Sequence, residues 1–105
     1  MKVFKFGGAS VKDADGVKNL VTVLKTTEEK DLVVIVSAMG KMTNQLELIV
    51  SNYFLNPKEV NVSIANVYDY HFQIISDLFN NISHPIFNFL LKSKNKLQLF
   101  LENNK

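Results

Sequence analysis

The sequence predicts an α/β fold that begins with a βαβ unit and continues as helices. Two short apolar runs, at residues 2–6 and 32–38, are separated by an amphipathic stretch. Strands joined through a helix in this way pair in parallel through a right-handed crossover. From about residue 43 onward, apolar residues recur at helical spacing. We therefore expect two parallel strands with about four helices.

The first three elements follow from local patterns. Residues 2–6 form a short apolar run that ends at two glycines. Residues 13–26 predict a helix, because apolar side chains recur three, four and seven positions apart at Val17, Leu20, Val21 and Leu24. Residues 32–38 are a continuous apolar and β-branched run without alternation. Such a run favours a strand that is covered on both faces, as in a parallel sheet.

The rest of the chain predicts helices. Residues 43 to about 54 carry one apolar stripe, and Asn56 and Pro57 then provide a cap and a first helical position. Residues 57 to about 81 carry two neighbouring apolar stripes, and Pro85 restarts the helical pattern. Two strands do not make a stable sheet by themselves. We therefore expect another chain, or the rest of a larger domain, to complete the sheet.

Composition limits the function. The 105 residues suggest one domain at most, and a net charge of +2 is too balanced for a nucleic-acid-binding surface. All 12 basic residues are lysines, and the absence of cysteine excludes disulfides and thiolate metal sites. No signal peptide or apolar run of about 20 residues is present. We expect a soluble cytoplasmic protein without a metal site and without nucleic-acid or membrane partners.

The candidate chemistry lies where the two strands end. Ligands of open α/β sheets bind beyond the carboxyl ends of the strands. Gly7 and Gly8 would let backbone amides approach a phosphate, and the helix that follows would offer its N-terminal amides to the same anion. Lys5, just before the glycines, would bring an ammonium group to a transferring phosphoryl group. These residue types in this order indicate an anion-binding loop.

The second strand ends in hydroxyl side chains. Ser37 and Thr43, together with the amide of Asn44, would hold a small polar substrate. Neither loop has the spacing of a P-loop or of a dinucleotide fingerprint. Simpler interpretations remain for each residue: Lys5 as an edge-strand lysine that blocks aggregation, the glycines as a plain turn, and the hydroxyls as helix caps.

Two sequence blocks carry a resemblance to a known family. The blocks KFGGASV, at residues 5–11, and VSAMGKMTNQL, at residues 36–46, occur in this order with a βα unit between them. With them, the chain resembles the opening of aspartokinases, which belong to the amino-acid kinase family and share its carbamate kinase-like three-layer fold. The resemblance implies phosphorylation of the side-chain carboxylate of L-aspartate by ATP with Mg²⁺, the first step toward lysine, threonine and methionine.

The resemblance also implies roles for individual residues. By position, Lys5 matches the catalytic lysine that stabilises the transferred phosphoryl group. The phosphate-side loop would comprise Lys5, Gly7, Gly8 and Ser10, and the aspartate site would include Ser37 and Thr43. Met42 departs mildly from the Thr or apolar residue that is commoner at its position.

Aspartokinases continue for several hundred residues beyond these blocks. They carry a glutamate and an arginine for the amino acid, a nucleotide-binding half and usually ACT domains, none of which is found in residues 1–105. We interpret the chain as the N-terminal part of an incomplete amino-acid kinase domain that is inactive alone. The alternative is a non-catalytic, self-associating or regulatory α/β module that retains the loops. The apolar stripes of the helices predict a homo-oligomer.

Overall fold

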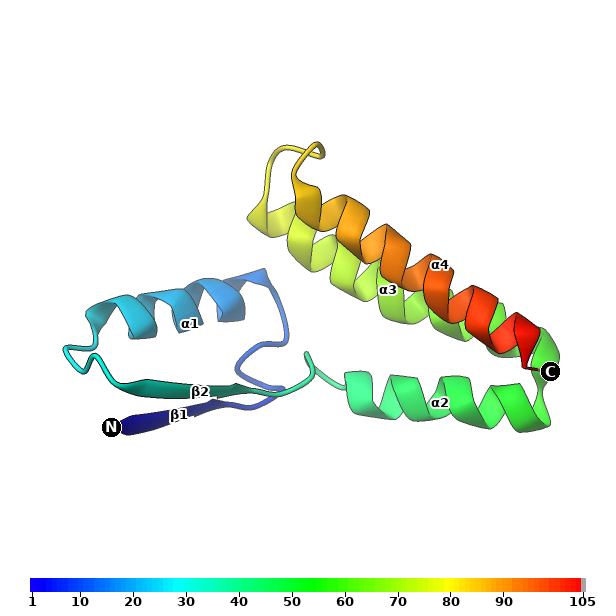
Figure 1. The fold of residues 1–105 in the computed structure, drawn as a ribbon, viewed down its shortest axis with the longest axis horizontal. Coiled ribbons are helices and arrows are strands. Elements are labelled where there is room, and N and C mark those ends of the chain that lie inside the picture. The colour runs from blue at the N-terminus through cyan, green and yellow to red at the C-terminus, as the bar shows by residue number, and fades with distance from the viewer. Residues whose placement is uncertain (105) are drawn as a thin grey trace. The chain divides into compact units, whose positions relative to one another are not determined.

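The computed structural model describes residues 1–104, which form two compact units. Unit 1 is Met1–Thr43, and unit 2 comprises the described residues from Asn44 onward. The elements in chain order are β1 (Lys2–Phe6), α1 (Ala14–Thr26), β2 (Leu32–Val36), α2 (Met42–Leu55), the 3₁₀ turn η1 (Pro57–Glu59), α3 (Val60–Leu78) and α4 (Pro85–Asn103) (Figure 1). The expected α/β class, with two parallel strands and four helices, is confirmed.

Unit 1 is built on the two strands. They pair in parallel with a register that runs from Lys2 opposite Leu32 to Phe6 opposite Val36. Helix α1 connects them and lies along one side of the pair (Figure 1). Asp13 begins α1 as its N-cap, because the Asp13 carboxylate accepts a hydrogen bond of 2.8 Å from the Gly16 amide. The predicted strand and helix are thus found within one residue of the expected bounds.

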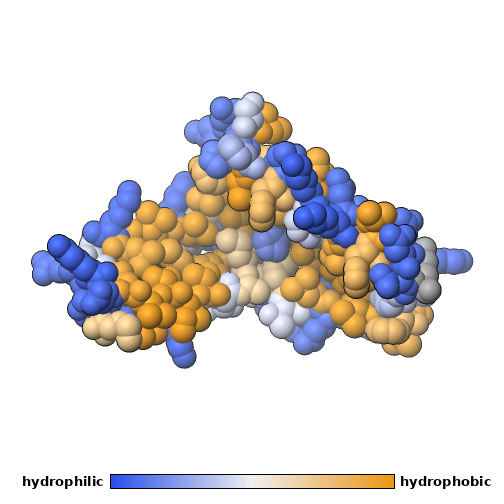
Figure 2. All heavy atoms as spheres, viewed as in Figure 1, coloured by the Kyte–Doolittle hydropathy of each residue, from blue (hydrophilic) through white to orange (hydrophobic). Residues whose placement is uncertain are grey.

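Strand β2 differs from its prediction in length and in burial. It ends at Val36, two residues earlier than expected. The expectation that both of its faces are covered is wrong, because Val33 to Val36 are all exposed. Figure 2 shows hydrophobic residues gathered on the surface of unit 1, over the two strands. The apolar run correctly predicts a strand, but no described segment buries it on both sides.

The best-buried side chains of unit 1 lie beyond the strands. Val11, in the loop after β1, is only 1% exposed, and Met42, after β2, is 6% exposed. Ala14, the first residue of α1, is also buried. The buried side chains of unit 1 therefore lie in the turn after β1 and at the first residues of α1 and α2, whereas most other residues of the two loops are exposed.

Unit 2 is held together by side chains of its helices. Helices α3 and α4 lie side by side (Figure 1). Ile64, Val67 and Ile74 are buried along the predicted apolar stripe of α3. The hydroxyl groups of Tyr68 on α3 and Ser93 on α4 are hydrogen-bonded at 2.8 Å, and the rings of Phe72 and Phe87 meet edge to face at 5.5 Å. The stripe read from the sequence is thus the core of unit 2.

The helix breaks of unit 2 fall where proline predicts them. Asn56 precedes η1 and Pro57 is its first residue, although the Asn56 side chain makes no capping bond. His84 is the N-cap of α4: its Nδ1 accepts from the Ile86 amide, and its ring stacks on Phe79 at 4.2 Å. Within residues 1–104, none of the helices has the length and apolar character needed to cross a membrane.

Candidate active site

The structure brings two loops together at one edge of the sheet: residues 7–13, after β1, and residues 37–41, after β2. They are called the motif loops below. The Ser37 amide donates to the Phe6 carbonyl at 2.9 Å, immediately beyond the paired strands. The Gly40 amide then donates to the Gly8 carbonyl at 3.1 Å. Because parallel strands present their carboxyl ends at the same edge, this proximity follows from the topology of unit 1.

Lys5 lies at the end of β1 that faces these loops. It pairs in register with Ile35, one position before the last pair of the ladder. Alternation along the strand places its side chain on the same face as Val3 and opposite to Phe4 and Phe6. The side chain is exposed, and no ion pair within residues 1–104 engages it. The ammonium group is therefore accessible to a bound anion.

The loop after β1 is a tight turn around the Gly7 carbonyl. This oxygen accepts hydrogen bonds from the amides of Ser10 at 3.0 Å and Val11 at 3.2 Å. The amides of Gly8 and Ala9, between them, do not take part in these bonds. They are the donors that this loop offers to an anion.

The N-terminus of α1 carries a cap of its own. The prediction that the N-terminal amides of α1 face the same anion stays a prediction; among these amides, that of Gly16 donates to the Asp13 carboxylate. This carboxylate also places a negative charge at the start of the helix, where it opposes a second anion.

The glycines of the motif loops are not equivalent. A Cβ atom added at Gly7 would have nothing within 4 Å, whereas one at Gly8 would lie 2.5 Å from the Gly40 carbonyl oxygen and 3.3 Å from that of Ala38. Gly40 has a φ of 55°, the single positive φ among residues 1–104. Sequence reasoning gave Gly40 no role, although a glycine inside the second block was the available signal.

The two hydroxyl residues assigned to the substrate lie on the second loop and at its end. Both Ser37 and Thr43 are exposed. The Ser37 hydroxyl donates to the Ala38 carbonyl at 2.8 Å, which leaves its oxygen able to accept. Thr43 stands in the first turn of α2, beside the buried Met42. Ser10, on the first loop, is exposed as well. The residues named from the sequence thus border one accessible edge of unit 1.

Comparisons with known proteins agree with this arrangement. The sequence model described as the amino acid kinase family matches residues 1–97. The chain belongs to the amino acid kinase family. Aspartokinase 1, chloroplastic, from Arabidopsis thaliana is 34% identical over 80 residues, and an aspartokinase from Rickettsia conorii is 48% identical over 44 residues. The resemblance to aspartokinases that the two blocks indicate is therefore confirmed.

These matches cover a much larger share of this chain than of either relative. They include 72% and 40% of this chain, but only 14% of the Arabidopsis protein and 11% of the Rickettsia protein. No solved structure matches the chain. As a member of the amino acid kinase family, the chain thus corresponds to a small share of the length of its curated relatives.

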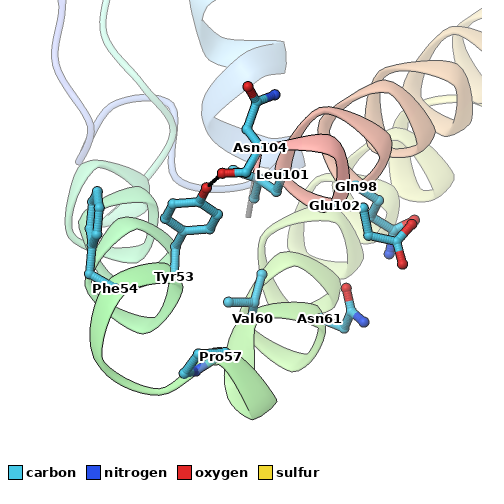
Figure 3. Close-up of a pocket in the computed structure, with 9 residues that line it drawn as sticks. All are labelled: Tyr53, Phe54, Pro57, Val60, Asn61, Gln98, Leu101, Glu102 and Asn104. Atoms are coloured by element: carbon cyan, nitrogen blue, oxygen red, sulfur yellow. Dashed lines mark hydrogen bonds between the residues drawn. The ribbon is translucent and has the colours of Figure 1, made fainter.

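A cavity of about 510 Å³ lies within unit 2 (Figure 3). Its walls come from α2, η1, α3 and the end of α4, namely Tyr53, Phe54, Pro57, Val60, Asn61, Gln98, Leu101, Glu102 and Asn104. The Tyr53 hydroxyl donates to the Asn104 carbonyl across one end (Figure 3). No sequence pattern signalled this cavity, because its residues come from separate segments. None of them belongs to the motif loops, so the cavity is not part of the candidate active site.

Proposed function

We propose that the chain forms the amino-acid side of the active site of an aspartate kinase, which transfers the γ-phosphoryl group of ATP to the side-chain carboxylate of L-aspartate. One observation carries the proposal: the hydrogen bond from Gly40 to Gly8 holds the two motif loops together beside Lys5. Membership of the amino acid kinase family and the likeness to two aspartokinases support it.

The exposed groups of Lys5 and of the motif loops suit this reaction. Phosphoryl transfer depends on positioning and on stabilising the charge of the transferred group. Lys5 supplies the positive charge, and the amides of Gly8 and Ala9 donate to phosphoryl oxygens. The hydroxyls of Ser37 and Thr43 hold the aspartate. As one oxygen of the aspartate side chain bonds to phosphorus, the bond from phosphorus to ADP breaks.

ATP supplies the phosphoryl group, and Mg²⁺ neutralises charge on its phosphates. The edge of unit 1 that carries Lys5 and the motif loops fits a phosphate. It combines the unpaired ammonium group of Lys5 with the free amides of Gly8 and Ala9. Within residues 1–104, no group of three or more His, Asp or Glu side chains that could hold a metal ion is found. In this proposal Mg²⁺ arrives with the nucleotide, and other parts of the enzyme bind the adenosine.

The proposal gives residues 1–105 the place of an N-terminal part of a larger kinase domain. The enzyme would be cytoplasmic and would begin the biosynthesis of lysine, threonine and methionine. Residues 1–105 alone are expected to be inactive, because they contain no arginine for the substrate. Turnover of ATP with aspartate by the purified chain would contradict this expectation.

The experiment uses the complete enzyme that contains residues 1–105, with formation of aspartyl hydroxamate as the measurement. Lys5→Ala should lower kcat about 10²-fold or more, because it removes charge stabilisation in the transition state. Lys2→Ala is the matched control: it removes an exposed lysine from the same strand, on the opposite face. An unchanged kcat in Lys5→Ala would remove Lys5 from the mechanism.

A second candidate function is a non-catalytic module that self-associates through apolar surface. It is favoured by exposed side chains on β2 and on the helices, among them Phe54, which is 73% exposed. Surface of this kind usually finds a partner. We propose a two-fold homodimer, to be measured by sedimentation equilibrium at several micromolar concentrations. A single species of 11.9 kDa throughout would rule the dimer out. Phosphorylation of aspartate by the complete enzyme would rule out a purely non-catalytic role.

A further inference from the structure

We propose that the backbone contact between Gly8 and Gly40, called the joint below, sets the distance between the loop after β1, on the phosphate side, and the loop after β2, on the substrate side. Gly40 is then a positioning residue. The effect on catalysis rests on the proposed function, whereas the joint itself rests on geometry alone. Nothing in the sequence motifs assigns Gly40 a role, because its contact is with a residue on another loop.

The contact between the two glycines is close and involves backbone on both sides. The Gly40 amide donates to the Gly8 carbonyl at 3.1 Å. The Gly40 carbonyl oxygen lies so near that a Cβ atom on Gly8 would be 2.5 Å from it. A φ of 55° lets Gly40 present its amide and its carbonyl to Gly8 together. A side chain at Gly8 would require a shift of backbone, and a side chain at Gly40 would be strained by its positive φ.

The two glycines of the joint lie close in sequence to the proposed functional groups. Lys5 lies three residues before Gly8, and Ser37 and Thr43 lie three residues before and after Gly40. A buried side chain also lies near the end of each loop: Val11 in the turn after β1, and Met42 as the first residue of α2. The loops are short segments with a buried residue near one end, and we expect a displacement at the joint to reach these groups.

Catalysis should be sensitive to such a displacement. Nonbonded carbon atoms rest about 3.5–4.0 Å from their neighbours, so the methyl group of Gly8→Ala would push the loops about 1 Å apart. A misplacement of about 1 Å can cost about 10²-fold in rate. Lys5 and the substrate hydroxyls would all remain present, but at the wrong separation.

The structural test uses the ¹⁵N,¹³C-labelled chain. A scalar coupling through the hydrogen bond, between the Gly40 amide nitrogen and the Gly8 carbonyl carbon, is expected in the unaltered chain. The Gly40 amide should exchange with solvent at least about tenfold faster in Gly8→Ala than in Gly7→Ala. Gly7→Ala adds the same methyl group in the same loop, where nothing lies within 4 Å.

Signals of Ser37 and Thr43 should move in Gly8→Ala and stay in place in Gly7→Ala. Circular dichroism and the protection of β1 and β2 amides check that each variant is folded. If Gly8→Ala does not fold, the coupling in the unaltered chain still decides whether the hydrogen bond exists. Absence of that coupling, or equal exchange in the two folded variants, would overturn the joint.

The kinetic test uses the complete enzyme. Gly8→Ala should lower kcat for aspartate about 10²-fold, with a smaller rise in KM. A folded Gly8→Ala enzyme that lacks the joint but keeps its kcat would overturn the positioning role. If the unaltered enzyme does not phosphorylate aspartate, the proposed function fails, while the coupling and the exchange rates still decide the joint.

Discussion

The two units of the chain bury their side chains in different kinds of segment. In unit 1, β2 is largely exposed, and the best-buried side chains, Val11 and Met42, lie in the turn after β1 and at the first residue of α2, next to loops that a backbone hydrogen bond joins. In unit 2, burial runs along a helix, with Ile64 fully enclosed, and the connections are exposed. The difference teaches that the candidate site depends on backbone geometry, whereas unit 2 depends on side-chain volume. Changes at glycines should therefore act on unit 1, and losses of apolar volume on unit 2.

The largest expected effect is in the core of unit 2. Ile64→Ala should lower the free energy of unfolding by about 2–5 kcal/mol, because it leaves a cavity around a side chain with no exposed surface. Val62→Ala is the control on the same helix, since Val62 is 56% exposed and its loss should change stability by about 0.5 kcal/mol or less. Urea unfolding followed by the helical signal at 222 nm measures both. Equal losses would mean that burial along α3 does not stabilise unit 2.

A smaller effect is expected in the second loop of unit 1. Gly40→Ala should destabilise this unit by about 1–2 kcal/mol, because a side chain disfavours the left-handed φ of Gly40. Gly7→Ala needs no positive φ and meets no atom within 4 Å, so it should be neutral or slightly stabilising. Thermal unfolding followed through amide signals of unit 1 measures the difference. Similar stabilities in the two variants would show that the loop relaxes to an ordinary φ at no cost.

The sequence was a good guide to elements whose signals are local. Helical spacing predicted the stripe of α3, and proline marked the starts of η1 and α4. The same local signals could not show what covers a strand. The run from Val33 to Val36 has the composition of a buried strand, but burial depends on segments that pack against it, and none of those described here encloses both faces.

The candidate site was predictable to a similar depth. The motif and the parallel topology were enough to place Lys5 and Ser37 at one edge of the sheet. They could not indicate the conformation of Gly40, because its contact is with Gly8, more than thirty residues earlier in the chain. At the N-terminus of α1 a local signal was present but was not used: Asp13 is a typical N-cap residue, and its side chain accepts from the Gly16 amide.

The smallest expected effect concerns this cap and refines the comparison between the units. Asp13→Ala removes the acceptor of the Gly16 amide and should destabilise unit 1 by about 1 kcal/mol. Asp13→Asn keeps an acceptor and should retain most of the stability, while Asp15→Ala removes one charge from the same helical turn without touching the cap. Thermal unfolding of the three variants, followed by the α1 amide signals, separates the hydrogen bond from the charge. Equal losses in Asp13→Ala and Asp15→Ala would assign the effect to charge alone. A greater loss in Asp13→Ala would instead show that unit 1 is stabilised, next to its candidate site, by the single hydrogen bond from the Gly16 amide to the Asp13 side chain.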